Sequence, residues 1–196
     1  MGTMKRSSHA KQMLAIQLLL CALVFDSFVY VSRSFAAEMP AGEKRTAIFR
    51  LYASYMDEFP EVRGISALQA MALHRRGAVV FVDVRKPAEM EISTLPGAVG
   101  ADAFRAHPDR YRGRTAVAYC TIGYRSGLFA KKMAEQGVPV FNLEGGILAW
   151  LWEGGELLDA GGGAVKRVHV YAQKWDLAPP GYETIRFGFW QRLFIK

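Results

Sequence analysis

The sequence predicts an α/β protein, with a three-layer αβα domain built on a mainly parallel central sheet. Three β-prone runs alternate with helical segments, and their continuous apolar character is typical of strands covered on both faces. The 196-residue length suits one domain with a smaller appendage. A hydrophobic content of 51% excludes disorder as the main state, and two cysteines exclude a disulfide scaffold or a four-cysteine zinc site.

The N-terminal segment 1–36 has the pattern of an export signal. Basic residues precede an apolar run at 13–25, and Ser34-Phe35-Ala36 offers small residues to a signal peptidase. That run is shorter than the roughly 20 residues of a membrane-spanning helix. We therefore expect a cleaved signal and a periplasmic protein. The alternative is an uncleaved anchor over residues 13–31, which would give the chain a membrane association.

The net charge of +7 gives little indication of a partner. Four of the 25 basic residues and one of the 18 acidic residues lie in 1–36, so the remainder carries +4. This excess does not favour a nucleic-acid partner. Removal of 1–36 would leave Cys120 as the single cysteine, and a single cysteine cannot form an internal disulfide. The four histidines are too far apart in sequence to predict a metal site.

Two helices are expected before the first strand. Apolar residues at spacings of three and four predict a helix over 41–58, and Pro60 closes it. We assign 41–60 to an N-terminal helical extension. A second helix is expected over 65–74, with Ser66 as its N-cap and Gln69 completing a capping box.

Alternating strands and helices follow, which favours parallel strand pairing. Strands are expected at 78–82, 115–119 and 138–143, and helices at 86–91, 126–136 and 147–152. Beyond them, a glycine-rich loop at 154–163 leads to an added strand at 165–171 and an aromatic, basic tail at 186–196. We expect this tail to pack on the domain.

The loop from Cys120 to Arg125 is the most informative segment. It follows a buried strand and precedes a helix, so it lies at the carboxyl edge of the sheet, where ligands bind in α/β proteins. Backbone N–H groups of such a loop, the helix N-terminus and the Arg125 guanidinium would place Cys120 in a positive field. This field favours the nucleophilic thiolate over the thiol. Gly123 allows the backbone to turn tightly.

Four motifs in register resemble the rhodanese family of sulfurtransferases. The six-residue loop resembles the active-site loop of that family, and the supporting segments are Val82-Asp83-Val84-Arg85, Leu95-Pro96-Gly97-Ala98 and Asn142-Leu143-Glu144-Gly145-Gly146 with Trp150. The resemblance covers about residues 60–152. It implies a rhodanese-like αβα domain over 61–153, followed by a C-terminal extension at 154–196.

The resemblance also implies a reaction and a set of site residues. Cys120 would accept a sulfane sulfur from a small sulfur-containing anion such as thiosulfate, and the resulting persulfide would pass that sulfur to a thiol or to cyanide. No cofactor or metal is implied. Cys120 and Arg125 are the catalytic residues, Asp83 and Arg85 support the sheet edge, and the substrate-binding residues are Thr121, Ile122, Gly123, Tyr124 and Ser126.

The sequence leaves two other functions open. The domain could be a non-enzymatic module that binds a partner or senses redox state through Cys120. It could also be an oxyanion reductase or phosphatase, although related phosphatases use a loop one residue longer. Glu89 is interpreted as a structural partner rather than an acid catalyst, and His74, His107 and His169 as structural or surface residues.

Overall fold

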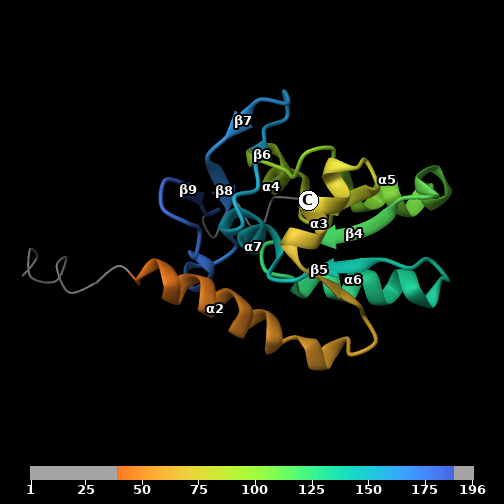
Figure 1. Ribbon diagram of the computed structural model, residues 1–196, viewed down its shortest axis with the longest axis horizontal. Helices are drawn as coiled ribbons and strands as arrows, with labels where there is room; N and C mark the ends of the chain where they lie inside the picture. The colour runs from red at the N-terminus through yellow and green to blue at the C-terminus, as the bar shows by residue number, and fades with distance from the viewer. Residues whose placement is uncertain (1–38, 188–196) are drawn as a thin grey trace, which may run out of the picture. The chain divides into compact units, whose positions relative to one another are not determined.

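A computed structural model describes residues 39–187 of the chain (Figure 1). The expected export signal and the end of the C-terminal tail lie outside these residues. Within 39–187, no helix is long and apolar enough to cross a membrane. In the same part of the chain, no group of three or more His, Cys, Asp or Glu side chains is arranged to hold a metal ion.

Five parallel strands form the central sheet, in the order β1-β5-β4-β2-β3. Their bounds are β1 (Gly64–Ile65), β2 (Val79–Asp83), β3 (Val99–Gly100), β4 (Thr115–Tyr119) and β5 (Phe141–Leu143). The central strands β2 and β4 pair along their whole length, which sets Asp83 opposite Tyr119. The carboxyl ends of these strands therefore meet at the edge that carries the Cys120 loop.

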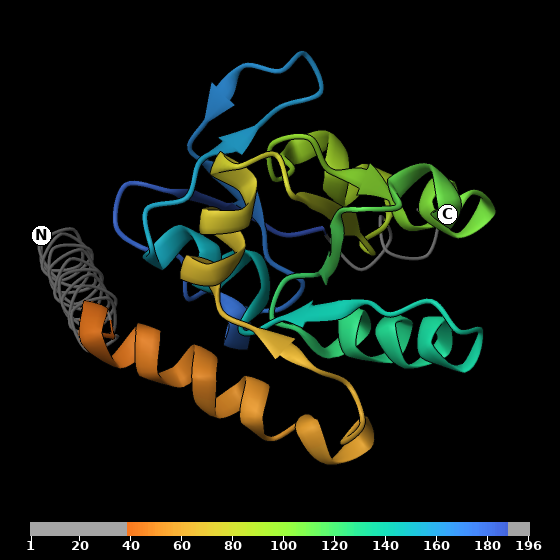
Figure 2. The same ribbon diagram turned by 45° about the vertical axis from the view of Figure 1, so that its right-hand side comes forward.

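Helices cover both faces of the sheet, as Figures 1 and 2 show. Alternate side chains of β2 point to opposite faces, because the side-chain period of a strand is two. Phe81 packs in one core cluster with α3 (Ala67–Arg75) and α7 (Gly146–Trp152), and Val80 in another with α5 (Ala101–Ala106) and α6 (Tyr124–Glu135). The predicted three-layer αβα architecture is thus confirmed.

Several element boundaries differ from the sequence predictions. The first helix, α2 (Ala41–Ala53), is shorter than expected, and a 3-10 turn, η1 (Met56–Glu58), takes up part of the remaining length. The last strand of the sheet begins at Phe141 rather than Val138, because Pro139 has no N–H to donate to a strand ladder. The capping box at the start of α3 is confirmed. The backbone N–H of Gln69 donates to Ser66 Oγ at 3.3 Å, and the backbone N–H of Ser66 donates to Gln69 Oε1 at 3.0 Å.

The sequence analysis did not predict several short elements. Two-residue strands β1 and β3, the helix α5 and the 3-10 turn η2 (Pro108–Tyr111) were not predicted. A two-residue strand cannot show the apolar periodicity that marks a strand in a sequence. The helix α4 (Pro87–Ile92) lies close to the expected position at 86–91.

The C-terminal extension packs on the domain. A hairpin of β6 (Leu157–Leu158) and β7 (Ala164–Val165) comes first, and β8 (Arg167–His169) then pairs in parallel with β9 (Glu183–Ile185). The turn η3 (Gln173–Trp175) separates the last two strands. Within the predicted strand at 165–171, only 167–169 is a continuous strand. Val168 and Val170 are fully buried in the same core cluster as Phe81, so the extension contributes to that core.

Candidate active site

The sulfur of Cys120 lies at the start of the strand-to-helix loop. Cys120 is 2% exposed, and the Gly123 N–H donates a hydrogen bond to its Sγ at 3.2 Å. Gly123 has φ of +107°, and a β-carbon there would lie 2.5 Å from the Tyr52 ring, so this position requires glycine. Because Gly123 already makes the turn, α6 starts at Tyr124, two residues earlier than predicted.

Asn142 fixes the loop from the neighbouring strand β5. Its side-chain amide donates to the Gly123 carbonyl at 2.9 Å, and its side-chain oxygen accepts from Ser126 Oγ at 2.7 Å. Ser126 Oγ also lies 3.6 Å from Cys120 Sγ. A hydroxyl has one proton, so Ser126 Oγ donates either to Asn142 Oδ1 or to the Cys120 sulfur at any one time. Asn142 was read in the sequence only as part of a motif and not as a site residue.

The other predicted loop residues point in different directions. Thr121 is buried, and its Oγ1 has no hydrogen-bond partner within the described residues. Ile122 is 1% exposed and its side chain packs in the core cluster, so this side chain is not available to a ligand. The Tyr124 hydroxyl donates to Glu58 at 2.9 Å, and its ring packs on Tyr55. Tyr124 therefore contacts the N-terminal extension.

Arg125 is held at the end of the loop by Glu89 of α4. Two guanidinium nitrogens donate to the two carboxylate oxygens at 2.6 and 2.9 Å. Burial opposes the Glu89 charge, but the hydrogen bonds from Arg125 and His169 outweigh it and hold the pKa of Glu89 well below its usual range. Burial likewise opposes the Arg125 charge, yet Glu89 and the nearby Cys120 raise the pKa of Arg125. The guanidinium is therefore a fixed positive charge close to the sulfur.

Asp83 and Arg85 form a second, fully buried ion pair at the same sheet edge. Arg85 donates to both Asp83 oxygens, at 2.9 and 2.7 Å, and to the Ser93 carbonyl at 2.5 Å. The Tyr119 hydroxyl donates to Asp83 at 2.5 Å and accepts the Leu95 N–H at 3.1 Å. Burial alone would lower the pKa of Arg85, but the charge of Asp83 raises it. This network joins the ends of β2 and β4 directly before Cys120.

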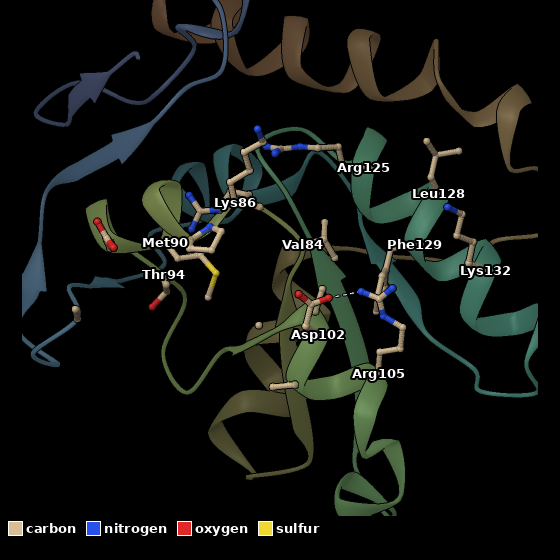
Figure 3. A pocket seen from close by; sticks show the side chains of 17 residues that line it. Val84, Lys86, Met90, Thr94, Asp102, Arg105, Arg125, Leu128, Phe129 and Lys132 are labelled. Atoms are coloured by element: carbon tan, nitrogen blue, oxygen red, sulfur yellow. Dashed lines mark hydrogen bonds and ion pairs between the residues drawn. The ribbon is translucent and has the colours of Figure 1, made fainter. Parts of the chain in front are cut away.

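A cavity of about 860 Å³ opens beside Arg125, between the ends of β2 and β3 and the helix α6 (Figure 3). Val84, Leu128 and Phe129 contribute apolar surface. The basic residues that line the cavity outnumber the acidic ones: they are Arg85, Lys86, Arg105, Arg125 and Lys132, against Glu91 and Asp102. Cys120 is not among the lining residues. The cavity thus offers a positively charged approach to Arg125 rather than to the sulfur itself.

His169, which the sequence analysis interpreted as a structural or surface residue, is a buried residue of the site. It comes from β8, is 2% exposed, and its Nδ1 lies 3.0 Å from Glu89 Oε1. The two residues are 80 positions apart, so no local motif joins them. The sequence signal for His169 was the alternation of polar and apolar residues, because His169 lies between two valines in a predicted strand.

Comparison with known proteins identifies the domain. A family model of the rhodanese-like domain matches residues 66–153. The tRNA uridine(34) hydroxylase of Bordetella petrii is 40% identical over an alignment of 87 residues, and the match covers 39% of this chain and 34% of that protein. The tRNA uridine(34) hydroxylase of Bordetella avium is 29% identical over 165 residues, covering 72% of this chain and 68% of that protein. This chain thus spans about a third of the first relative.

Among solved structures, the thiosulfate sulfurtransferase of Pseudomonas aeruginosa is 20% identical, with a TM-score of 0.47. That match covers 67% of this chain and 26% of the other. The family model includes β2, the Cys120 loop and α7, and its last position is one residue beyond the end of α7. Residues 66–153 of this chain therefore form a rhodanese-like domain.

Proposed function

We propose that the protein is a sulfurtransferase, which accepts a sulfane sulfur on Cys120 and passes it to a thiol or to cyanide. The observation that carries this proposal is the position of the Cys120 sulfur: it accepts the Gly123 N–H at 3.2 Å in a loop that ends in the fixed positive charge of Arg125. The Gly123 N–H can stabilise negative charge on the sulfur during the reaction, and Arg125 attracts an anionic donor. The rhodanese-like domain match supports the same function.

The reaction proceeds in two steps that balance. The Cys120 thiolate attacks the outer sulfur of thiosulfate, a bond forms between the two sulfurs, and sulfite leaves with the electron pair of the broken S–S bond. An acceptor thiolate or cyanide then attacks the outer sulfur of the Cys120 persulfide. The product is a persulfide or thiocyanate, and the Cys120 thiolate is the leaving group. No net redox partner is needed.

Loop residues would lower the barrier by stabilising the charges of both steps. The Gly123 N–H stabilises the thiolate before attack and on its departure, and the Arg125 charge stabilises the thiosulfate oxygens and the leaving sulfite. Asn142 keeps the loop in this shape through its bonds to Gly123 and Ser126. The low exposure of Cys120 selects small reagents.

Intact-mass measurement tests the proposal directly. The full chain is incubated with thiosulfate, and we expect the mass to increase by one sulfur atom, with release of that sulfur on addition of cyanide. Cys120→Ser should gain no sulfur, whereas Cys21→Ser should behave as the wild type, because Cys21 lies outside the domain. A wild-type chain that gains no sulfur from any sulfane donor contradicts the proposal and leaves a non-enzymatic binding or redox-sensing module.

The relatives favour a second candidate function, a reaction on tRNA uridine. Several proteins named tRNA uridine(34) hydroxylase match this chain, and the match to that of Bordetella avium covers 72% of this chain. Nucleoside mass spectrometry on tRNA from cells that overproduce the wild type or Cys120→Ser tests this candidate. A modified uridine that appears with the wild type alone would favour it over sulfur transfer to small molecules.

We also propose that residues 1–36 export the protein to the periplasm, or anchor it to the membrane through 13–31 if they are not cleaved. The support is the sequence pattern alone. N-terminal sequencing of protein from its native host, after cell fractionation, tests this proposal. An intact N-terminus on a cytoplasmic protein would contradict it and would keep the tRNA candidate open, because tRNA is not found in the periplasm.

A further inference from the structure

One side of the C-terminal strand extends from α4 to the Cys120 loop. Arg167, His169 and Tyr171 are spaced by two residues, so their side chains lie on the same side of an extended segment. Arg167 Nε donates to the Ile92 carbonyl at 3.2 Å, and the Arg167 carbonyl accepts from Ser93 Oγ at 2.8 Å. These bonds fix the segment to the end of α4, the helix that carries Glu89.

The next residue on this side is His169, which binds the carboxylate that holds Arg125. Its Nδ1 lies 3.0 Å from Glu89 Oε1, and both side chains are 2% exposed. Glu89 is ionised in this network, so His169 Nδ1 carries the proton and donates. The opposite nitrogen, Nε2, has no hydrogen-bond partner within residues 39–187, and the ring packs on Phe187 with centroids 4.2 Å apart. The hydrogen bond that fixes the imidazole is therefore the one to Glu89.

The third residue, Tyr171, contacts Arg125 directly. The Arg125 guanidinium carbon lies 5.7 Å from the centre of the Tyr171 ring, within cation–π range. Arg125 is thus restrained by Glu89 on α4 and by the Tyr171 ring. Both Tyr171 and His169 lie outside the 66–153 range of the rhodanese-like family model.

We propose that His169 and Tyr171 are positioning residues for Arg125, which makes the C-terminal extension part of the sulfur-transfer site. The role in sulfur transfer rests on the proposed function, whereas the positioning of Arg125 does not. His169 fixes the plane of the Glu89 carboxylate and shares its negative charge. Without His169, the carboxylate turns and no longer holds the Arg125 guanidinium beside the Cys120 loop, or Glu89 neutralises Arg125 more completely. Either change lowers the positive potential at Cys120.

A pair of alkylating reagents measures this potential. Iodoacetate is an anion and iodoacetamide is neutral, so the ratio of their rates at Cys120 reports the positive charge around the sulfur. The full chain is used, and peptide mass spectrometry reads Cys120 separately from Cys21. We expect His169→Leu to lower the ratio by about threefold or more, and Tyr171→Leu to lower it less, since a cation–π contact at an exposed ring is weaker than a buried charged hydrogen bond.

Two controls separate positioning from general loosening of the fold. Loosening raises both alkylation rates, whereas loss of the Arg125 charge slows iodoacetate more than iodoacetamide. His169→Asn keeps a donor near the Nδ1 position and should restore the wild-type ratio. His74→Leu removes a histidine that packs on Phe81 and Trp150, and it should leave the ratio unchanged.

The alkylation ratios of the variants decide the proposal. An unchanged or increased ratio in His169→Leu overturns the proposal, as does a His169→Asn variant that behaves like His169→Leu. If His169→Leu does not fold, Tyr171→Leu decides, because Tyr171 is 42% exposed and its replacement leaves the core intact. Sulfur uptake from thiosulfate is then measured on the same variants. A wild type that takes up no sulfur defeats the proposed function, while the alkylation ratio still decides whether His169 positions Arg125.

Discussion

Two arginine–carboxylate pairs stand at the same edge of the sheet, and they differ in access to solvent. The Arg85 and Asp83 side chains are both 0% exposed, and each also bonds to neighbouring protein groups. The Arg125 side chain is 31% exposed, although its partner Glu89 is 2% exposed. The first pair, the closed pair, is screened from solvent, although Arg85 also lines the cavity beside the loop; the second, the open pair, presents a solvent-exposed arginine to that cavity. The same ionic chemistry therefore serves the fold in one place and the site in the other.

The comparison predicts its largest effect at the closed pair. Arg85→Met leaves the Asp83 carboxylate buried without its counter-charge, and breaking such a pair costs about 3–5 kcal/mol of unfolding free energy. Urea denaturation followed by fluorescence measures the loss. Arg125→Met is the matched control and should lose clearly less, because Glu89 keeps its bonds to His169 and to the Lys86 amide. Equal losses in the two variants would mean that exposure does not separate the pairs.

The second prediction concerns the rate of sulfur transfer instead of stability, and here we expect the larger effect at the open pair. Arg125→Met should lower the rate of persulfide formation from thiosulfate by about 100-fold, the usual scale for loss of one group that stabilises developing negative charge. The variant stays folded, so the decrease is measured on intact protein by rapid mixing and mass spectrometry. Arg105→Met is its control, since Arg105 lines the same cavity and pairs with Asp102. A similar decrease in both variants would point to the general field of the cavity and not to Arg125.

The two pairs also show which contacts of the site could be predicted from the sequence. Asp83 and Arg85 are two residues apart directly after a buried strand, so their interaction is local and was expected. The Cys120 loop is equally local. Glu89 and Arg125 are 36 residues apart, and His169 is 80 residues from Glu89. These contacts follow from the order of the strands and from the packing of β8 on α4, which no single segment of the sequence specifies.

The third prediction concerns pH. The pKa of Glu89 is lower in the folded chain than the value of about 4.3 expected when the chain is unfolded. The unfolded state therefore binds the proton first, and the stability that Glu89 contributes is complete above that unfolded value and is lost as the pH falls below it. Glu89→Gln should be less stable than the wild type at pH 7, and the difference should shrink toward pH 3.

Urea midpoints at the two pH values measure this effect. Glu91→Gln on the same helix is the control, because Glu91 is exposed and takes no part in the hydrogen bonds that hold Glu89. It should keep the wild-type dependence on pH. A Glu89→Gln difference that stays constant from pH 7 to pH 3 would show that the carboxylate charge does not stabilise the open pair.

The smallest expected effect tests whether the closed pair acts on the fold alone. Tyr119→Phe removes the hydroxyl that donates to Asp83 and accepts the Leu95 N–H, and loss of a buried hydrogen-bonding group costs about 1–3 kcal/mol. Burial and the Asp83 charge raise the pKa of Tyr119, so this hydroxyl is a donor at every pH used here. Tyr111→Phe is the control, since the Tyr111 ring stacks on Phe104 and stays in place.

Because the Tyr119 hydroxyl contacts Asp83 and not the sulfur, persulfide formation by the folded Tyr119→Phe variant should match the wild type. A slower rate would mean that the closed network, one residue before Cys120, also sets the position of the sulfur.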